Sequence, residues 1–163
     1  MDAYLDIETT GLMPGENQIT VIGIYLPELD QGRVVQLVGR DITEPNLLEA
    51  LADVHTIYTY NGSRFDLPFI RHALGTDLFN LCRHHDLMYD CWKCNLKGGL
   101  KRVEVTLNIG RELQGVTGWD AVLLWQRWVD YGDTEALERL LHYNREDVVN
   151  LKTLREKLEE IVW

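Results

Sequence analysis

The sequence contains no apolar run long enough to span a bilayer, and it does not open with the basic and apolar segments of a secretory signal. It is also poor in positive charge, with 16 Lys and Arg residues against 26 Asp and Glu residues and a net charge of −10 at pH 7. This balance argues against nucleic-acid affinity built on bulk positive charge, so a phosphate substrate would need local basic residues and bound cations. Cysteine is scarce as well, and an odd count of three argues against a secreted disulfide framework. We therefore expect a cytoplasmic protein with no membrane partner.

The chain is long enough to bury a sizeable core. Hydrophobic residues make up 45% of its 163 residues, which suits a compact α/β domain. No repeat, linker or low-complexity segment interrupts the sequence. We therefore expect residues 1–163 to form one domain.

The spacing of apolar residues predicts a mixed β-sheet flanked by helices. Three strands joined by short turns predict an antiparallel meander, and a helical crossover makes a fourth strand parallel to the first. The expected fold class is α/β, with a mixed five-stranded sheet in which parallel strands extend the meander. The predicted strands are an opening strand that Gly11 ends, then residues 19–26, 33–38, 56–60 and 86–88, and the predicted helices cover residues 45–51, 65–74, 100–109, 119–129 and 134–161.

The opening strand carries two acidic residues, Asp6 and Glu8, at alternate positions. Side chains alternate between the two faces of a strand, so both carboxylates point the same way. Two buried carboxylates repel each other and are costly to desolvate, and a divalent cation compensates both costs most directly. The alternative is that the strand frays by residue 8 and leaves Glu8 in solvent.

Two further Asp residues occupy positions from which a carboxylate could join this pair. Asp66 follows the fourth strand, so it is either the N-cap of the next helix or another site carboxylate. Asp147 lies in the apolar stripe of the last helix, with Leu140, Leu151 and Leu154, and therefore faces the core. Its alternative role is a structural ion pair with a neighbouring Arg. Four carboxylates without matching fixed cations would form an acidic pocket suited to Mg²⁺ or Mn²⁺.

Taken together and in order, these motifs resemble those of the DEDD (DnaQ-like) exonuclease superfamily, which has the ribonuclease H-like fold. Residues 6–11 (DIETTG) resemble its first motif, residues 60–69 (YNGSRFDLPF) its second and residues 143–147 (YNRED) its third. Within the superfamily, the sequence most resembles the YprB-like exonuclease domains, as the segments Asp86-Leu87 and LKGGLK (residues 96–101) also indicate. The resemblance covers about residues 3 to 155.

The resemblance implies a metal-dependent exonuclease that hydrolyses phosphodiester bonds at the ends of single-stranded DNA or RNA, in the 3′→5′ direction of most relatives. It implies two Mg²⁺ or Mn²⁺ ions. Asp6 would bridge both ions, Glu8 and Asp147 would bind the ion beside the attacking water, and Asp66 would hold the second ion. The alternatives are a structure-selective ribonuclease H-like endonuclease and a non-catalytic nucleic-acid-binding module.

The residue that orients the attacking water has two candidates. The superfamily divides by whether a Tyr four residues, or a His five residues, precedes the last Asp, and this chain has both Tyr143 and His142. A helix that is continuous from Thr134 keeps Tyr143 on the same face as Asp147, whereas a break near Leu141 would turn His142 inward. We favour Tyr143.

Contacts to the substrate are predicted from the residues that flank the motifs. The backbone at Thr9 and Thr10 and the side chain of Phe65 could pack against the terminal nucleotide, although Phe65 could equally serve helix packing. The densest basic cluster contains Lys97 and Lys101, and its alternative is a solvated loop. The substrate-binding residues that we predict are Thr9, Thr10, Asn61, Phe65, Lys97 and Lys101.

Two other features have simpler interpretations. Trp119, Trp125 and Trp128 fall on one predicted helix and are interpreted as core or surface anchors. Cys91 and Cys94 have a CxxC spacing that invites a zinc site, but their distance from the preceding Cys and His residues does not match common zinc fingers.

Overall fold

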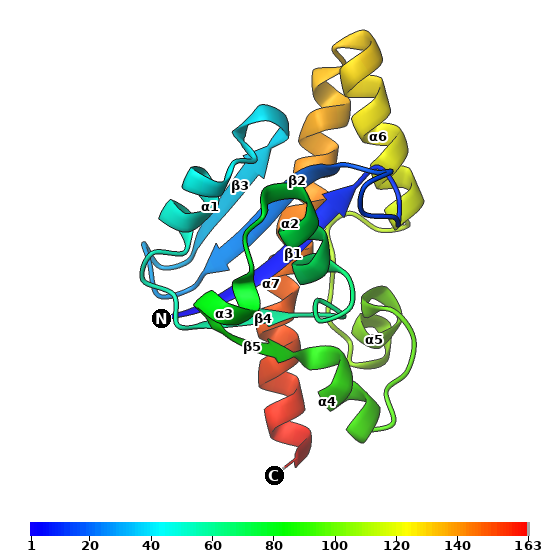
Figure 1. Ribbon diagram of the computed structural model, residues 1–163. Coiled ribbons are helices and arrows are strands. Elements are labelled where there is room, and N and C mark those ends of the chain that lie inside the picture. Colours follow the sequence, from blue (N-terminus) through cyan, green and yellow to red (C-terminus); the bar gives the residue numbers. More distant parts are fainter. Residues whose placement is uncertain (163) are drawn as a thin grey trace.

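The computed structural model describes residues 1–162, and the side chains of residues 1–161. Its centre is a five-stranded sheet of order β3-β2-β1-β4-β5, in which the first three strands are antiparallel and β1, β4 and β5 are parallel (Figure 1). This confirms the predicted α/β fold class with a mixed five-stranded sheet. The strands are β1 (Asp2–Thr9), β2 (Ile19–Leu26), β3 (Arg33–Val38), β4 (Thr56–Thr59) and β5 (Arg83–Asp86).

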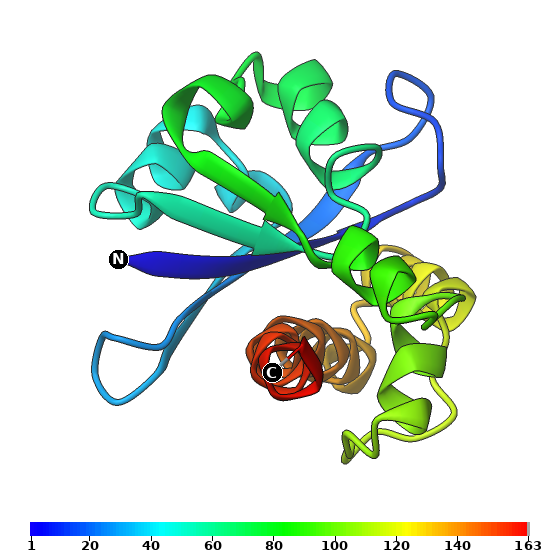
Figure 2. The same cartoon turned by 90° about the horizontal axis from the view of Figure 1, so that it is seen from below.

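Helices cover both faces of the sheet (Figure 2). One face packs against α1 (Glu44–Ala50), α2 (Asp66–Leu74) and α3 (Leu78–Leu81), and the other packs against the long helix α7 (Thr134–Val162). The remaining helices are α4 (Leu87–Lys93), α5 (Leu100–Thr106), α6 (Gly118–Tyr131) and the short 3-10 helix η1 (Gly39–Asp41). No helix within residues 1–162 combines the length and the apolar character that crossing a membrane would require.

The period of two in β1 assigns its side chains to these two layers. Leu5 and Ile7 belong to the core beneath α1, α2 and α3, whereas Tyr4 belongs to the core that includes Leu151 and Leu154 of α7. The residues at even positions of β1 therefore face α7. This is the geometric reason why acidic residues from β1 and α7 can meet.

The segment between residues 81 and 99 differs from the prediction. The fifth strand, predicted at residues 86–88, spans Arg83–Asp86, and Leu87 begins helix α4. The strand is fixed by its parallel register with β4, in which Thr56 pairs with Arg83. The carboxylate of Asp86 then accepts a hydrogen bond from the Met88 amide at 3.1 Å and caps the helix.

Candidate active site

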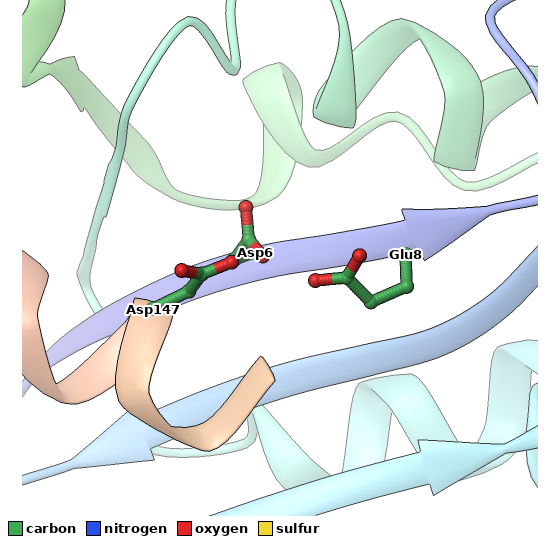
Figure 3. A group of neighbouring side chains, drawn as sticks. All are labelled: Asp6, Glu8 and Asp147. Atoms are coloured by element: carbon green, nitrogen blue, oxygen red, sulfur yellow. The ribbon is translucent and has the colours of Figure 1, made fainter. Parts of the chain in front are cut away.

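Three carboxylates from two elements converge on the α7 side of the sheet (Figure 3). Asp6 and Glu8 extend from β1 and Asp147 from α7, and one oxygen of each lies within 4.8 Å of the others. Glu8 is 8% exposed and Asp147 is 3% exposed, so the strand does not fray at residue 8. The alternative, in which Glu8 lies in solvent, is therefore wrong.

A glycine in β2 lets α7 approach the sheet beside this cluster. Asn144 donates from Nδ2 to the backbone oxygen of Asp6 at 3.3 Å, and its Oδ1 accepts from Gln36 Nε2 at 3.1 Å. Gly23 pairs with Asp6 across the sheet, and a Cβ at this position would lie 2.1 Å from Asn144 Oδ1. The contact fixes α7 one helical turn before Asp147. This contact was not predicted from the sequence, although a glycine inside an otherwise apolar strand is a signal of close backbone approach.

Asp66, at the start of α2, contacts β1 at Ile7. Its Oδ2 accepts a hydrogen bond from the Ile7 amide at 3.0 Å, and the side chain is buried. Phe65, not Asp66, holds the N-cap position of α2, and it caps without a side-chain hydrogen bond. The N-cap interpretation of Asp66 is therefore wrong, and its carboxylate is directed at the backbone of β1 between Asp6 and Glu8.

Burial and neighbouring carboxylates raise the pKa values of Asp6, Glu8 and Asp66. Burial, and then the charges of Asp147, Glu8 and Asp66, hold the pKa of Asp6 well above its usual value. Burial and the charge of Asp147 raise the pKa of Glu8 to about 8. Burial raises the pKa of Asp66 to about 7, against the hydrogen bond from Ile7. A buried, all-oxygen set of mutually repelling carboxylates is a fitting donor set for a hard divalent cation such as Mg²⁺ or Mn²⁺.

Two fixed cations contact Asp147. Lys101 Nζ lies 2.6 Å from Asp147 Oδ1, and Arg111 Nη2 contacts the same oxygen. The expectation that no fixed cation matches the carboxylates is therefore wrong at Asp147. The residue combines both predicted roles, because it joins the acidic cluster and also pairs with an Arg.

Arg111 is held in place by a buried acid. Its Nε lies 2.9 and 3.1 Å from the two carboxylate oxygens of Glu104, which also accepts from Asn150 Nδ2 at 2.6 Å. Glu104 lies on α5 and Asn150 on α7, so this network fastens the chain after α5 over the acidic cluster. Arg111 and Glu104 were not predicted from the sequence, because neither belongs to a motif and only the tertiary fold links them to Asp147.

The continuous helix α7 separates Tyr143 from His142. Tyr143 is buried on the side of the cluster, and Lys101 Nζ lies 4.4 Å from the centroid of its ring. Burial and the charge of Asp147 raise the pKa of the Tyr143 hydroxyl above its usual value. His142 Nε2 instead lies 3.0 Å from a carboxylate oxygen of the exposed Glu112. The helix therefore directs Tyr143, and not His142, toward Asp147.

The turn after Glu8 contains two of the predicted substrate contacts. Thr9 Oγ1 donates to the Gly11 carbonyl at 2.6 Å, and Thr10 Oγ1 accepts from the Gln18 amide at 2.9 Å. Both hydroxyls thus stabilise the turn that leads from β1 to β2. The ring of Phe65 packs edge-on against Phe69, with centroids 5.5 Å apart.

Of the remaining predicted contacts, Asn61 lies in the loop after β4, Lys97 lies between α4 and α5, and Lys101 lies on α5. Asn61 adopts a left-handed backbone (φ 62°), its amide donates to Asp86 Oδ1 at 2.8 Å, and its own Oδ1 is buried without a partner among the described residues. Lys97 is exposed. Lys101 is the one predicted contact that reaches the acidic cluster, through Asp147.

The tryptophans of α6 and the cysteines lie apart from the carboxylates. Trp119 is exposed, and Trp125 packs within the cluster that includes Val21. Cys91 of α4 is buried in the hydrophobic core that includes Leu151 and Leu154 of α7, whereas the Cys82 thiol faces the Val54 carbonyl. Within residues 1–162, the group of side chains positioned to hold a metal ion is that of Asp6, Glu8 and Asp147, and it includes no cysteine.

Similarity to known proteins covers nearly the whole chain. A family model described as the RNase H superfamily matches residues 3–159. YprB of Bacillus subtilis (strain 168) is 29% identical over 168 aligned positions, which cover 93% of this chain and 40% of YprB. The chain therefore spans less than half the length of this relative.

Solved structures with a similar fold include two of NrnC from Brucella melitensis. NrnC bound to pGG matches with a TM-score of 0.65 and 24% identity, and NrnC with bound Mg²⁺ matches with a TM-score of 0.64 and 22% identity. Each comparison covers 98% of this chain and 72% of NrnC. A structure described as the apo form of a nuclease matches with a TM-score of 0.63 and 23% identity, over 96% of this chain and 70% of that one. These similarities and the family match confirm the ribonuclease H-like fold and the relationship to YprB that the motifs predicted, and the chain belongs to the RNase H superfamily.

Proposed function

We propose that the chain is a divalent-metal-dependent exonuclease that hydrolyses phosphodiester bonds at the 3′ ends of single-stranded DNA or RNA. The observation that carries this proposal is the cluster of half-buried Asp6 with buried Glu8 and Asp147, in which one oxygen of each carboxylate lies within 4.8 Å of the others. Membership of the RNase H superfamily supports it, as do the pGG and the Mg²⁺ bound in the NrnC structures.

The four acidic residues are assigned to the metal ions. Two Mg²⁺ or Mn²⁺ ions held there would supply an activated water and stabilise charge on the leaving oxygen. Asp6 is assigned to both ions, Glu8 and Asp147 to the ion beside the attacking water, and Asp66 to the other. The hydrogen bond from the Ile7 amide orients Asp66 for this role, since it fixes one oxygen of the carboxylate.

Tyr143 is proposed to orient the attacking water through its hydroxyl. Because its pKa is raised, the phenol stays protonated at neutral pH and acts as a hydrogen-bonding group, not as a base. Lys101 packs against its ring and limits its movement. Lys101 and Arg111 also bring positive charge to a chain of net charge −10, so they are assigned to attracting the phosphate as well as to holding Asp147.

The test is digestion of 5′-labelled and 3′-labelled single-stranded DNA and RNA with Mg²⁺ or Mn²⁺. We expect a ladder of 5′-labelled products that shortens from the 3′ end. Asp6→Asn should abolish turnover, whereas Asp2→Asn on the same strand, where Asp2 pairs with Arg155, should retain it. Undiminished turnover by Asp6→Asn would refute the assignment.

A circular or end-blocked substrate separates the enzymatic alternatives. Release of label from such a substrate would indicate an endonuclease, and a strict requirement for a free end would support the exonuclease. Binding of single strands without turnover under any metal condition would indicate a non-catalytic module.

A further inference from the structure

Two aromatic side chains and an arginine lie together in the segments that follow the parallel strands β4 and β5. Tyr89 and Trp92 of α4 pack edge-to-face with ring centroids 5.1 Å apart. The guanidinium carbon of Arg64, in the loop after β4, lies 5.8 Å from the centroid of Tyr89 and 5.6 Å from that of Trp92. We refer to Arg64, Tyr89 and Trp92 as the aromatic platform. None of the three was assigned a role by the motifs, the acidic cluster or the core.

The strand register relates the platform to the acidic cluster. Tyr4 pairs with Tyr58 in the parallel pair β1–β4, so Asp6 is level with Tyr60 two residues further on. Thr59 pairs with Asp86 in β4–β5, so Tyr60 is level with Leu87, the first residue of α4. Two strand spacings, about 10 Å, therefore separate Asp6 from the start of the helix that carries the platform. Helix α4 starts at the carboxyl end of β5 (Figures 1 and 2), and ligands of sheets with parallel strands bind outside the carboxyl ends of those strands.

The loop that contains Arg64 leads directly into α2, and hydrogen bonds to Asp86 hold it in place. Asp86 accepts hydrogen bonds from the Asn61 amide at 2.8 Å, from the Ser63 amide at 3.1 Å and from the Ser63 hydroxyl at 2.7 Å. Ser63 Oγ also lies 3.5 Å from the Tyr89 hydroxyl. These hydrogen bonds hold the platform in a fixed position relative to Asp66, two residues after Arg64.

The charge and exposure of the platform suit a nucleic-acid strand. Trp92 is 41% exposed and Arg64 is exposed, so the ring and the guanidinium are both open to a ligand from solvent. Exposed Lys97 lies on the neighbouring loop, which is tied to Tyr60 by the hydrogen bond from its hydroxyl to the Gly98 carbonyl at 2.7 Å. On a chain of net charge −10, this surface is a local exception that combines aromatic and basic side chains. Nucleic-acid bases can stack on its aromatic rings, and phosphates can contact its basic groups.

We propose that the aromatic platform binds a nucleotide upstream of the cleaved end of a single-stranded substrate, with a base stacked on Trp92 and Tyr89 and a phosphate contacted by Arg64. This proposal rests on the proposed exonuclease function and extends it to substrate length. A stacked strand advances about 3.4 Å per nucleotide, so the roughly 10 Å from Asp6 to the start of α4 corresponds to about three nucleotides, and Trp92 lies further along the helix. The protein should therefore prefer strands of several nucleotides over dinucleotides.

The test measures binding and turnover separately. Fluorescence anisotropy with a 5′-fluorescein-labelled oligo(dT) six nucleotides long, in Ca²⁺, gives Kd without requiring turnover. Trp92→Leu should weaken binding about 5- to 150-fold, which is the range for loss of one base–aromatic stack. Trp92→Phe, which keeps an aromatic ring, should recover most of this loss. The matched control is Tyr131→Leu, which removes an exposed aromatic ring from the far end of α6.

Arg64→Gln tests the phosphate contact. It should lower the slope of log Kd against log salt concentration by about 0.7, the value for one phosphate contact on a single strand. Arg40→Gln, which removes an exposed Arg from η1 after β3, should leave the slope as it is.

Turnover then tests the expected length preference. For Trp92→Leu in Mg²⁺ or Mn²⁺, kcat/KM should fall at least fivefold more on the hexanucleotide than on a dinucleotide. The platform proposal is overturned if Trp92→Leu, shown to be folded by circular dichroism, binds the hexanucleotide as tightly as the wild type. It is also overturned if the variant loses the same factor in kcat/KM on the hexanucleotide and on the dinucleotide. Failure of the proposed function looks different, because the wild type would then turn over neither substrate while the binding measurements still decide the role of the platform.

Discussion

Replacing Asp6 by Asn should stabilise the metal-free protein while it removes the response to metal. The oxygens of Asp6, Glu8 and Asp147 lie within 4.8 Å of one another. At this distance and an effective dielectric constant of about 20, two full charges repel by about 3.5 kcal/mol. Asn keeps the shape of the side chain and its place beside Asn144, but it removes the charge.

The expected gain is smaller than the full repulsion and depends on pH. The pKa of Asp6 is raised in the folded protein and that of Glu8 is raised to about 8, so the folded state binds protons more tightly than the unfolded state. The wild type therefore loses stability as the pH rises from about 4, where unfolded carboxyls ionise, through about 8. Partial protonation and the cations beside Asp147 already weaken the repulsion that the substitution removes. We therefore expect Asp6→Asn to raise the free energy of unfolding by about 1–3 kcal/mol at pH 8 and by little at pH 5.

Thermal unfolding in EDTA measures this difference. For a chain of this length, 1 kcal/mol corresponds to about 2–4 °C, so the Tm of Asp6→Asn should exceed that of the wild type by about 2–12 °C at pH 8. With excess Mn²⁺ the order should reverse, because the wild type gains stability from the bound ion and the variant does not. A Tm for Asp6→Asn at or below that of the wild type at pH 8 in EDTA would refute the electrostatic reasoning.

The other predictions concern the contacts that hold the site together. Gly23→Ala should lower the free energy of unfolding by about 1–3 kcal/mol, because its Cβ would overlap Asn144, whereas Gly118→Ala at the start of α6, where a Cβ meets nothing within 4 Å, should hold or raise it. Urea titration of the two variants checks this, and equal effects would contradict it. Arg111→Gln should cost about 3–5 kcal/mol in EDTA, because it leaves the buried charge of Asp147 with one cation fewer. Added Mn²⁺ should raise the Tm of Arg111→Gln more than that of the wild type, and equal shifts would argue against competition between Arg111 and metal.

The parts of the fold that follow from local pattern were predictable. The strands Ile19–Leu26 and Arg33–Val38 have the predicted bounds, since apolar β-branched residues and flanking turns mark them in the sequence. The strand Arg83–Asp86 was misplaced by three residues, because it has no apolar residue and forms through its register with β4. Helix α4 was missed for a related reason, as its start depends on the cap that Asp86 provides.

The same distinction applies to the site. The convergence of Asp6, Glu8 and Asp147 follows from a period of two in a strand and a period of 3.6 in a helix, both of which are visible in the sequence. The approach of Lys101 and Arg111 to Asp147 spans 46 and 36 residues, and no local pattern encodes it. It depends on how the chain after α5 packs over α7, which is a property of the tertiary structure.

The uneven placement of the fixed cations also indicates where an ion is most needed. Lys101 and Arg111 both contact Oδ1 of Asp147, whereas no Lys, Arg or His nitrogen within the described residues lies within 4.0 Å of a carboxylate oxygen of Asp6 or Glu8. The negative charge that the protein leaves uncompensated is therefore concentrated on β1. A divalent cation that binds there relieves the repulsion between Asp6 and Glu8, and the two fixed cations keep Asp147 in place before the ion arrives.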